Sequence, residues 1–179
     1  MHERRFGADI ERLRSPQRVA LLEVDRVVDF CLEGTRGVTL LDVGTGSGIF
    51  AEAFAAHGLS VTAIDPNREM LETARRFVPA AHFTEGVLEN LPFQNRSFDL
   101  LFLGHVLHES DDMGKALRES RRVAKERVAI LEWPYREEEI GPPIYHRLVP
   151  ERVTTLASTT GFTRIQTITL AHMILFILQ

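Results

Sequence analysis

Three glycines at alternate positions carry the clearest chemical signal in this sequence. Gly44, Gly46 and Gly48 follow an apolar run, 38–43, and lead directly into an alanine-rich helical pattern. Glycine permits positive φ and removes the Cβ atoms from one side of a turn, so that backbone N–H groups can approach a ligand closely. The helix that follows adds unpaired N–H groups and the positive end of its dipole at the same place. This arrangement predicts a loop that binds a nucleotide-containing cofactor.

The spacing of the glycines limits the choice of cofactor. A dinucleotide-binding fingerprint reads G-x-G-x-x-G, whereas this loop reads G-x-G-x-G and has Ile49 where the third glycine would be. No Lys-Ser or Lys-Thr pair follows, which excludes a P-loop. The chain also lacks a Tyr-x-x-x-Lys pair, so a nicotinamide-dependent oxidoreductase is the weaker alternative. A plain strand-to-helix turn, as in any α/β protein, is the other interpretation of the loop.

Asp65 is the second candidate residue, and it ends the strand predicted at 61–64. A carboxylate at the tip of the strand after the glycine loop, about 20 residues further on, can accept hydrogen bonds from both hydroxyls of a ribose. Because Pro66 and Asn67 begin a helical pattern, an ordinary helix N-cap is the alternative role for this aspartate. The loop upstream favours the ribose.

The stretch 41–48, with the letters LDVGTGSG, resembles motif I of the class I S-adenosylmethionine-dependent methyltransferases. The resemblance implies S-adenosylmethionine as cofactor and S-adenosylhomocysteine as product. It also implies that the loop lies against the amino-acid part and the ribose of the cofactor. The residues that it assigns to cofactor binding here are Asp42, Gly44, Thr45, Gly46, Gly48, Asp65 and Pro66.

A second stretch, 85–93, is similar to a subset of the same family that reads Gly-Asp-Ala-Glu-x-Leu-Pro-Phe. In that subset the aspartate accepts a hydrogen bond from the adenine amino group. Here Val87 stands at that position, so it can pack on adenine while Leu88 still offers its backbone N–H. Because a neutral hydrogen bond contributes roughly 0.5–1.5 kcal/mol, we expect several-fold weaker cofactor binding rather than its loss.

The segment after the fourth apolar run holds the candidates for catalysis. Phe98-Asp99 before this run is again a marker of the family, and the resemblance places Gly104 and His105 beside the transferable methyl group. We favour His105 as the base that removes a proton from a hydroxyl or amine acceptor. Other candidates for the base are His108, Glu109, Tyr135 and His146. A metal site at His105, His108 and Glu109 is the rejected alternative, because no fourth ligand suggests itself, and a packed or hydrogen-bonded role is expected for His108.

Residues 134–150 differ in composition from the rest of the chain. Four prolines punctuate them, and a run of three glutamates, 137–139, is followed by aromatic residues. Because long loops at the carboxyl end of a sheet are often binding loops, we interpret this segment as the substrate loop, with a mere connector as the alternative. The candidate substrate residues are His108, Tyr135, Tyr145 and His146.

The pattern of elements predicts an α/β fold. Five strands alternate with helices and a hairpin follows, which indicates a Rossmann-like doubly wound sheet of seven strands, mostly parallel, with one antiparallel strand in the C-terminal hairpin. The whole chain, 1–179, is expected to be one methyltransferase domain with an N-terminal helical segment at 1–34. The predicted strands are 38–43, 61–64, 81–84, the apolar run after Ser97, 127–133, 162–170 and 172–178. The predicted helices are 16–33, 49–57, 67–77, 112–123 and 150–160. The arginines and lysine at 118–127 are expected to form a solvated basic face, with a patch that binds a substrate phosphate as the alternative.

Length and composition set further limits. The chain has 179 residues, of which 44% are hydrophobic and 26% charged, as in ordinary globular proteins. A net charge of −4 disfavours nucleic acid and anionic membranes as partners. The single cysteine, Cys31, excludes a disulfide framework and a cysteine metal cluster, and disfavours thiolate-dependent methylation. The most apolar segment, 170–178, is too short to span a bilayer, so we expect a cytoplasmic protein without a signal peptide.

Together these features predict an enzyme that transfers a methyl group from S-adenosylmethionine to a small-molecule acceptor by in-line displacement. Such a reaction needs no covalent enzyme intermediate, and the protein contributes mainly by aligning the reacting atoms. The alternative is a catalytically silent S-adenosylmethionine-binding or scaffold protein with a methyltransferase fold. Val87 and the absence of a decisive base favour that alternative slightly, whereas the glycine loop and Asp65 disfavour it.

Overall fold

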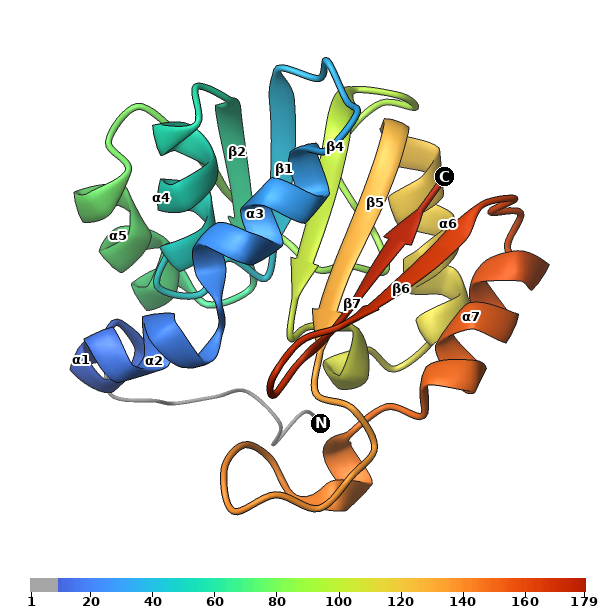
Figure 1. The fold of residues 1–179 in the computed structure, drawn as a ribbon. Coiled ribbons are helices and arrows are strands. Elements are labelled where there is room, and N and C mark those ends of the chain that lie inside the picture. Colours follow the sequence, from blue (N-terminus) through green and yellow to red (C-terminus); the bar gives the residue numbers. More distant parts are fainter. Residues whose placement is uncertain (1–9) are drawn as a thin grey trace.

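The computed structural model describes residues 10–179, and its centre is one sheet of seven strands in the order β3-β2-β1-β4-β5-β7-β6 (Figure 1). The pairs β1–β2, β1–β4, β2–β3 and β4–β5 are parallel, whereas β7 is antiparallel to both of its neighbours. This confirms the predicted doubly wound sheet with a reversed strand. The strands are β1 (Thr39–Val43), β2 (Ser60–Asp65), β3 (His82–Glu85), β4 (Phe98–Gly104), β5 (Ala124–Glu132), β6 (Ile165–Thr169) and β7 (Ile174–Leu178).

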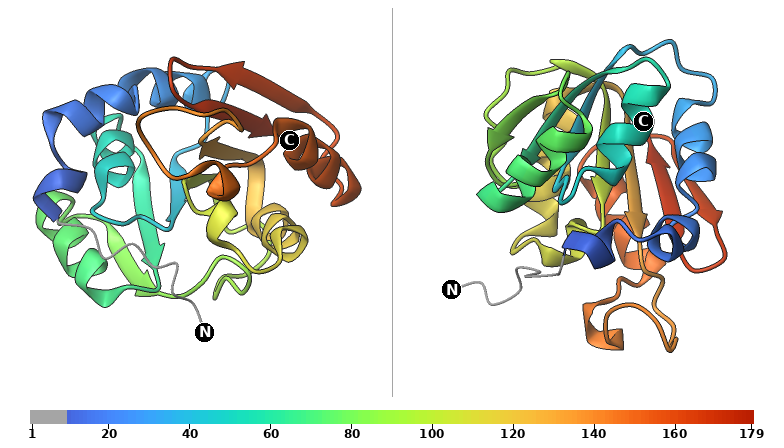
Figure 2. Two further views of the ribbon diagram at one scale, coloured as in Figure 1. Left: turned by 90° about the horizontal axis from the view of Figure 1, so that it is seen from below. Right: turned by 90° about the vertical axis from the view of Figure 1, so that its left-hand side faces the viewer.

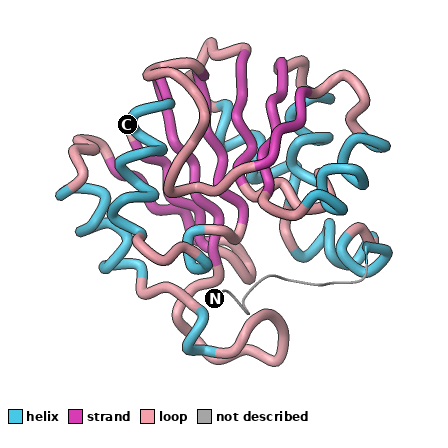
Figure 3. Tube along the Cα trace, turned by 180° about the vertical axis from the view of Figure 1, so that it is seen from behind, coloured by secondary structure: helices cyan, strands magenta, loops and turns pink. Residues whose placement is uncertain are grey.

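Helices cover both faces of the sheet because the central strands are apolar on both sides. One core cluster packs the helices at 24–32 and 49–56 against one face of the sheet, and a second packs those at 113–123 and 150–159 against the other face. Figure 3, in which the molecule is seen from behind, shows the helices at 113–123 and 150–159 in front of the strands. The helices are α1 (Ile10–Leu13), α2 (Pro16–Leu21), α3 (Val24–Leu32), α4 (Ile49–Ala56), α5 (Arg68–Phe77), α6 (Met113–Val123) and α7 (Pro150–Thr159), with 3-10 turns η1 (Leu107–Glu109) and η2 (Ile144–His146).

Several boundaries differ from the sequence-based expectation. The predicted helix 16–33 is broken into α2 and α3 at Glu23, whose φ of 49° is left-handed. β5 begins at Ala124, three residues earlier than expected, because strand pairing with β4 starts directly after α6 ends. Both strands of the C-terminal hairpin are shorter than predicted, since β6 and β7 pair only over 165–169 and 174–178.

The expected solvated basic face is wrong at two positions. Arg127 is buried, and its guanidinium donates to the backbone oxygen of Cys31 at 2.6 Å, so it joins β5 to α3. Arg122 donates to the backbone oxygens of Leu91 and Phe93 and pairs with Glu119, which fixes the loop before β4. These arginines therefore stabilise the fold rather than present charge to a ligand.

Asp99 has a structural role at the edge of the sheet opposite to the candidate site. Its Oδ2 accepts hydrogen bonds from the backbone N–H groups of Val38 and Thr39 and from the Thr39 hydroxyl. Lys125 donates to the other oxygen at 2.8 Å, and this bond together with the backbone donors holds the pKa of the carboxyl below its usual range. The Phe98-Asp99 marker thus connects the starts of β1 and β4.

The carboxyl ends of the parallel strands meet at one edge of the sheet, the lower edge in Figure 1. Seen from below, α1 and α2 lie on one side of this edge and the 134–150 loop crosses the other (Figure 2). Ligands of open α/β sheets bind outside the carboxyl ends of the strands, where the strand order reverses. Here that point lies between β1 and β4, next to the glycine loop.

Candidate functional site

The glycine loop adopts the conformation that its spacing predicts. Gly44, Gly46 and Gly48 have φ values of 69°, 52° and 81°, a region that other L-residues rarely adopt. A Cβ on Gly44 would lie 2.8 Å from a methyl of Val106, and a Cβ on Gly48 would lie 2.8 Å from that of Ala74. The first and third glycines are therefore required both by backbone angle and by close packing.

Four N–H groups of the glycine loop have hydrogen-bond partners within the protein. The N–H groups of Gly44 and Thr45 both donate to the backbone oxygen of Ile64, at 2.8 and 3.2 Å. Gly46 donates to Asp65 Oδ2 at 2.9 Å, and Gly48 donates to the backbone oxygen of Thr45. These four donors connect the loop to β2 and to itself, and they hold its conformation.

Asp65 connects the end of β2 to the glycine loop. One carboxylate oxygen accepts the Gly46 N–H, and the other accepts the N–H of Asn67 at 2.8 Å. The N-cap of α5 is Asn67, whose side chain accepts from two backbone N–H groups of that helix. The N-cap alternative for Asp65 is therefore wrong. Its buried carboxylate lies at the tip of β2, as a ribose-binding residue requires, next to Pro66 in the wall of the cleft described below.

Asp42 lies beneath the loop and is fully enclosed. The Thr45 hydroxyl donates to its Oδ2 at 2.6 Å. Burial raises the pKa of Asp42 to about 7, and the nearby charge of Asp65 acts in the same direction, while the hydrogen bond from Thr45 opposes it. The carboxyl group of Asp42 is therefore partly protonated near neutral pH. Its hydrogen bond with Thr45 supports the loop from below.

A cleft of about 180 Å³ opens next to the loop, between the ends of β1, β2 and β3 on one side and the segment after β4 on the other. One wall is apolar and contains the two expected adenine-contacting residues, Val87, which is exposed, and Leu88, which is buried. The lining also carries acidic side chains. Among the described residues the lining includes three carboxylates, Glu89, Glu109 and Asp111, and neither lysine nor arginine. The cleft therefore suits an apolar ring and a positive charge, and it disfavours phosphate.

Comparison with known proteins agrees with this geometry. A family model described as "Methyltransferase domain" matches residues 41–131, which is half of the chain and contains the loop, the cleft and β4. The chain belongs to this family. Membership implies S-adenosylmethionine as the methyl donor. The residues at hand fit that compound, because it carries an adenine, a ribose and positive charge but no phosphate.

Individual relatives are similar over the same region. The chain is 39% identical over 95 residues to a demethylmenaquinone methyltransferase of Chlorobaculum tepidum, which covers 52% of this chain and 39% of that protein. It is 35% identical over 101 residues to a malonyl-[acyl-carrier protein] O-methyltransferase of Erwinia pyrifoliae, and this match covers 56% of this chain and 38% of that protein. The matches thus span about two-fifths of these curated relatives. The solved structure of a SAM-dependent methyltransferase from Aquifex aeolicus superposes with a TM-score of 0.82 at 25% identity, over 94% of this chain and 95% of that one.

In this methyltransferase-family chain, His105 follows β4 in a strained and enclosed position. Its φ is 59°, which is uncommon for a residue with a side chain. Gly104 before it leaves room for the ring of Phe102, which a Cβ would approach to 2.9 Å. The His105 ring lies 5.7 Å from that of Trp133, and both ring nitrogens are buried without a hydrogen-bond partner in the described structure. Burial, together with the charges of Arg18 and His108, lowers the pKa of His105 well below its usual value, so the ring is neutral.

His108 is fixed by the buried carboxylate of Glu132 at the end of β5. Its Nδ1 lies 2.8 Å from Glu132 Oε2, and its backbone N–H donates to the other oxygen at 3.2 Å. The predicted hydrogen-bonded role of His108 is confirmed. Glu109, the next residue, lines the cleft. Glu132 was missed by sequence reasoning, because an acid at the end of an apolar strand gives no local sign of its partner 24 residues away.

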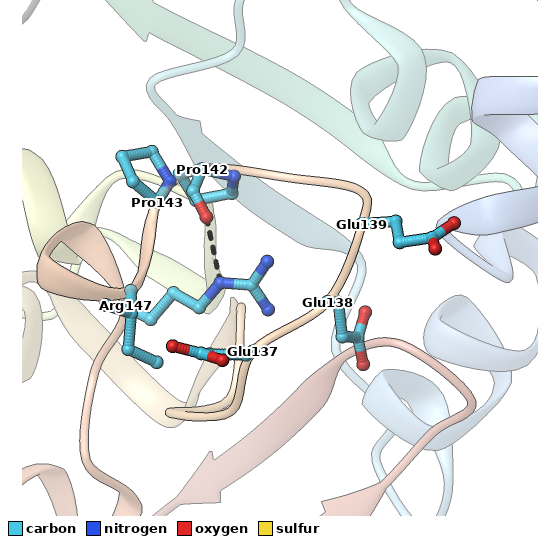
Figure 4. A pocket seen from close by; sticks show the side chains of 7 residues that line it. Glu137, Glu138, Glu139, Pro142, Pro143 and Arg147 are labelled. Atoms are coloured by element: carbon cyan, nitrogen blue, oxygen red, sulfur yellow. Dashed lines mark hydrogen bonds between the residues drawn. The ribbon is translucent and has the colours of Figure 1, made fainter.

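The 134–150 loop forms a separate hollow beyond β5, with a volume of about 420 Å³ (Figure 4). Arg147 lies inside the loop and donates to the backbone oxygens of Ile140 and Pro142 at 2.6 and 2.9 Å, while its guanidinium stacks 5.2 Å from the ring of Trp133. These bonds hold the loop together, and it includes the turn η2. Tyr135 and Tyr145 are exposed, and the Tyr145 ring contacts that of His146 at 4.6 Å. The hollow is larger than the cleft, but the glycine loop and Asp65 do not line it.

Arg14 in the N-terminal segment contacts the glycine loop, which the sequence did not indicate. Its Nη1 donates to the backbone oxygen of Ser47 at 2.7 Å, and the same guanidinium pairs with Glu52 on α4 and stacks 3.5 Å above the ring of Phe77 on α5. The turn between α1 and α2 is thus fixed across the carboxyl edge of the sheet. The pattern of charges before residue 15 carries no periodicity from which this contact could be inferred.

Other expectations concern absences and the single cysteine. Cys31 is buried, and burial raises the pKa of its thiol, as expected for an inert cysteine. Within residues 10–179 no group of three or more histidine, cysteine or acidic side chains is arranged to hold a metal ion. In the same range no helix has the length and apolar character needed to cross a membrane.

Proposed function

We propose that this protein transfers a methyl group from S-adenosylmethionine to a small-molecule acceptor. The observation that carries the proposal is the cleft beside the glycine loop, which combines apolar lining residues with three carboxylates and, within residues 10–179, no basic side chain. A nicotinamide dinucleotide would bring two phosphates into this acidic cleft. The family match over residues 41–131 supports the same donor.

Each part of the site has a role in this proposal. Asp65 accepts hydrogen bonds from the ribose hydroxyls, and the loop glycines allow the ligand to approach the backbone. The adenine packs on Val87 and accepts a hydrogen bond from the backbone N–H of Leu88, and the missing aspartate at position 87 weakens adenine binding several-fold. Gly104 and His105 lie beside the reacting methyl group. When bound, the cofactor supplies the electrophilic methyl, and the protein aligns it with the acceptor.

The acceptor is expected to enter over the 134–150 loop. Tyr135 and Tyr145 offer exposed aromatic surface, and His146 lies against Tyr145. His105 is neutral and therefore in the form that accepts a proton, although its nitrogens must be uncovered before they reach an acceptor. His108, held by Glu132, is the second candidate for this step. The names of the relatives suggest two acceptor classes to examine first, a naphthoquinol and a malonyl thioester.

Calorimetric titration of the purified protein tests the donor. We expect micromolar binding of S-adenosylmethionine and S-adenosylhomocysteine and no binding of NADH. Binding of NADH alone, or of none of the three, would contradict the assignment of the cleft. Methyl transfer is then measured with tritiated S-adenosylmethionine and two probes, 1,4-naphthoquinol and malonyl-coenzyme A.

A catalytically silent binder is the second candidate, and the loss of the adenine-binding acid at Val87 favours it. It predicts that the donor binds but that labelled methyl reaches no acceptor in a wider screen of phenols, amines and carboxylates. The enclosed His105 ring is compatible with either outcome, whereas turnover with any small acceptor excludes the silent binder.

A further inference from the structure

Glu109 differs from the other acidic residues that line the cleft. The Glu89 carboxylate accepts the backbone N–H of Asp111 at 2.8 Å, and Asp111 also has a further interaction. The Glu109 carboxylate makes no hydrogen bond or ion pair with the part of the chain that the structure describes, although its backbone N–H donates to Val106. Glu109 is half-buried and lines the cleft together with Val106 and Gly44.

The surroundings of Glu109 favour a positive charge in the cleft. Burial raises the pKa of this carboxyl, and the negative charges of Glu132 at the end of β5 and Asp65 at the end of β2 act in the same direction. His108, its neighbour on η1, opposes them. Because Glu89 and Asp111 also line the cleft, the carboxylate is partly dehydrated among other acids, which is unfavourable until a cation compensates it.

We propose that Glu109 recognises the sulfonium charge of the methyl donor and thereby makes the cleft prefer the donor over the demethylated product. This inference rests on the proposed function. The donor and product share the adenosine and amino-acid parts and differ by one methyl group and by the positive charge on sulfur. An interaction of Glu109 with that charge is therefore present before methyl transfer and lost after it. The same interaction would favour release of the product.

The test compares the affinities of S-adenosylmethionine and S-adenosylhomocysteine by calorimetry in wild type, Glu109→Gln and Glu89→Gln. The glutamine at 109 keeps the shape of the side chain and removes its charge. Glu89 serves as the control, because it lines the same cleft and its carboxylate already has a backbone partner. Unit charges several ångströms apart in a partly hydrated cleft attract enough to change affinity about three- to tenfold. We expect the donor-to-product affinity ratio to fall by that factor in Glu109→Gln only.

The outcomes distinguish a failure of the proposed function from a failure of the role of Glu109. If wild type binds neither compound, the proposed function fails and this inference fails with it. If both bind and the ratio is unchanged in Glu109→Gln, or falls equally in Glu89→Gln, the proposed function stands and the role of Glu109 is refuted. An interaction of Glu109 with the amino group, which both compounds carry, would also leave the ratio unchanged. Product affinity within about twofold of wild type shows that the cleft is intact.

A second variant covers the case in which Glu109→Gln loses affinity for both compounds. Glu109→Asp keeps the charge, so it should retain most of the preference for the donor. If Glu109→Asp also loses binding of the product, Glu109 supports the cleft structurally and the inference is refuted.

Discussion

Replacing Asp65 by alanine should reduce both stability and donor affinity. The carboxylate of Asp65 accepts the N–H groups of Gly46 and Asn67 at 2.9 and 2.8 Å, and it is buried. Hydrogen bonds to a charged group contribute roughly 1.5–3 kcal/mol each, so the free energy of unfolding should fall by about 3 kcal/mol. Loss of the ribose contacts should weaken S-adenosylmethionine binding at least tenfold, which corresponds to about 1.4 kcal/mol.

The matched control for this variant is Asp99→Ala. Asp99 also accepts backbone N–H groups through a partly buried carboxylate, but it joins Val38 and Thr39 at the opposite edge of the sheet. Urea unfolding followed by circular dichroism measures stability, and calorimetry below the unfolding transition measures affinity. We expect a loss of stability in both variants and a loss of affinity only in Asp65→Ala. Unchanged affinity in Asp65→Ala, or an equal loss in both, would refute the assignment of Asp65 to the ribose.

Three further predictions concern the loop, its buried acid and the substrate segment. In urea titrations the free energy of unfolding of Gly48→Ala should be about 1–3 kcal/mol lower than that of Gly46→Ala. Both glycines have positive φ, but only a Cβ at position 48 would push into α5. Asp42 has a raised pKa of about 7, so between about pH 4 and pH 7 the native state holds a proton that the unfolded chain has released. The free energy of unfolding should therefore decline over this range, by at most about 1.4 kcal/mol per pH unit. Urea titrations at several pH values should show a flatter decline in Asp42→Asn. In Gly141→Ala the new Cβ would lie 2.7 Å from the indole ring of Trp133, the residue after β5. Gly58 has a similar φ, and a Cβ there would meet no atom within 4 Å, so Gly58→Ala is the control. Acceptor turnover should fall in Gly141→Ala alone while donor affinity stays unchanged in both, and loss of donor affinity would place the loop in the cofactor site instead.

The family, the sheet and the cofactor loop could be predicted from the sequence because their signals are local. Continuous apolar runs mark strands that are buried on both faces, and alternate glycines mark a turn that must adopt positive φ. Asp65 was found because its position depends on the end of one strand and on the loop before it. The broken N-terminal helix was missed, since its apolar spacing continues across Glu23 while the backbone there turns left-handed.

The partners of the polar groups were decided only by the tertiary structure. The glycine loop lies beside β2, so the N–H groups of its first three residues bond to Ile64 and Asp65. The pairing of β4 with β5 brings Glu132 to His108 and leaves Glu109 in the cleft wall. These contacts join segments far apart in the chain, and a buried polar group takes whichever partner the sheet order places beside it. The sequence by itself therefore determined the type of cofactor site, whereas packing determined which carboxylates remain available to bind a ligand's charge.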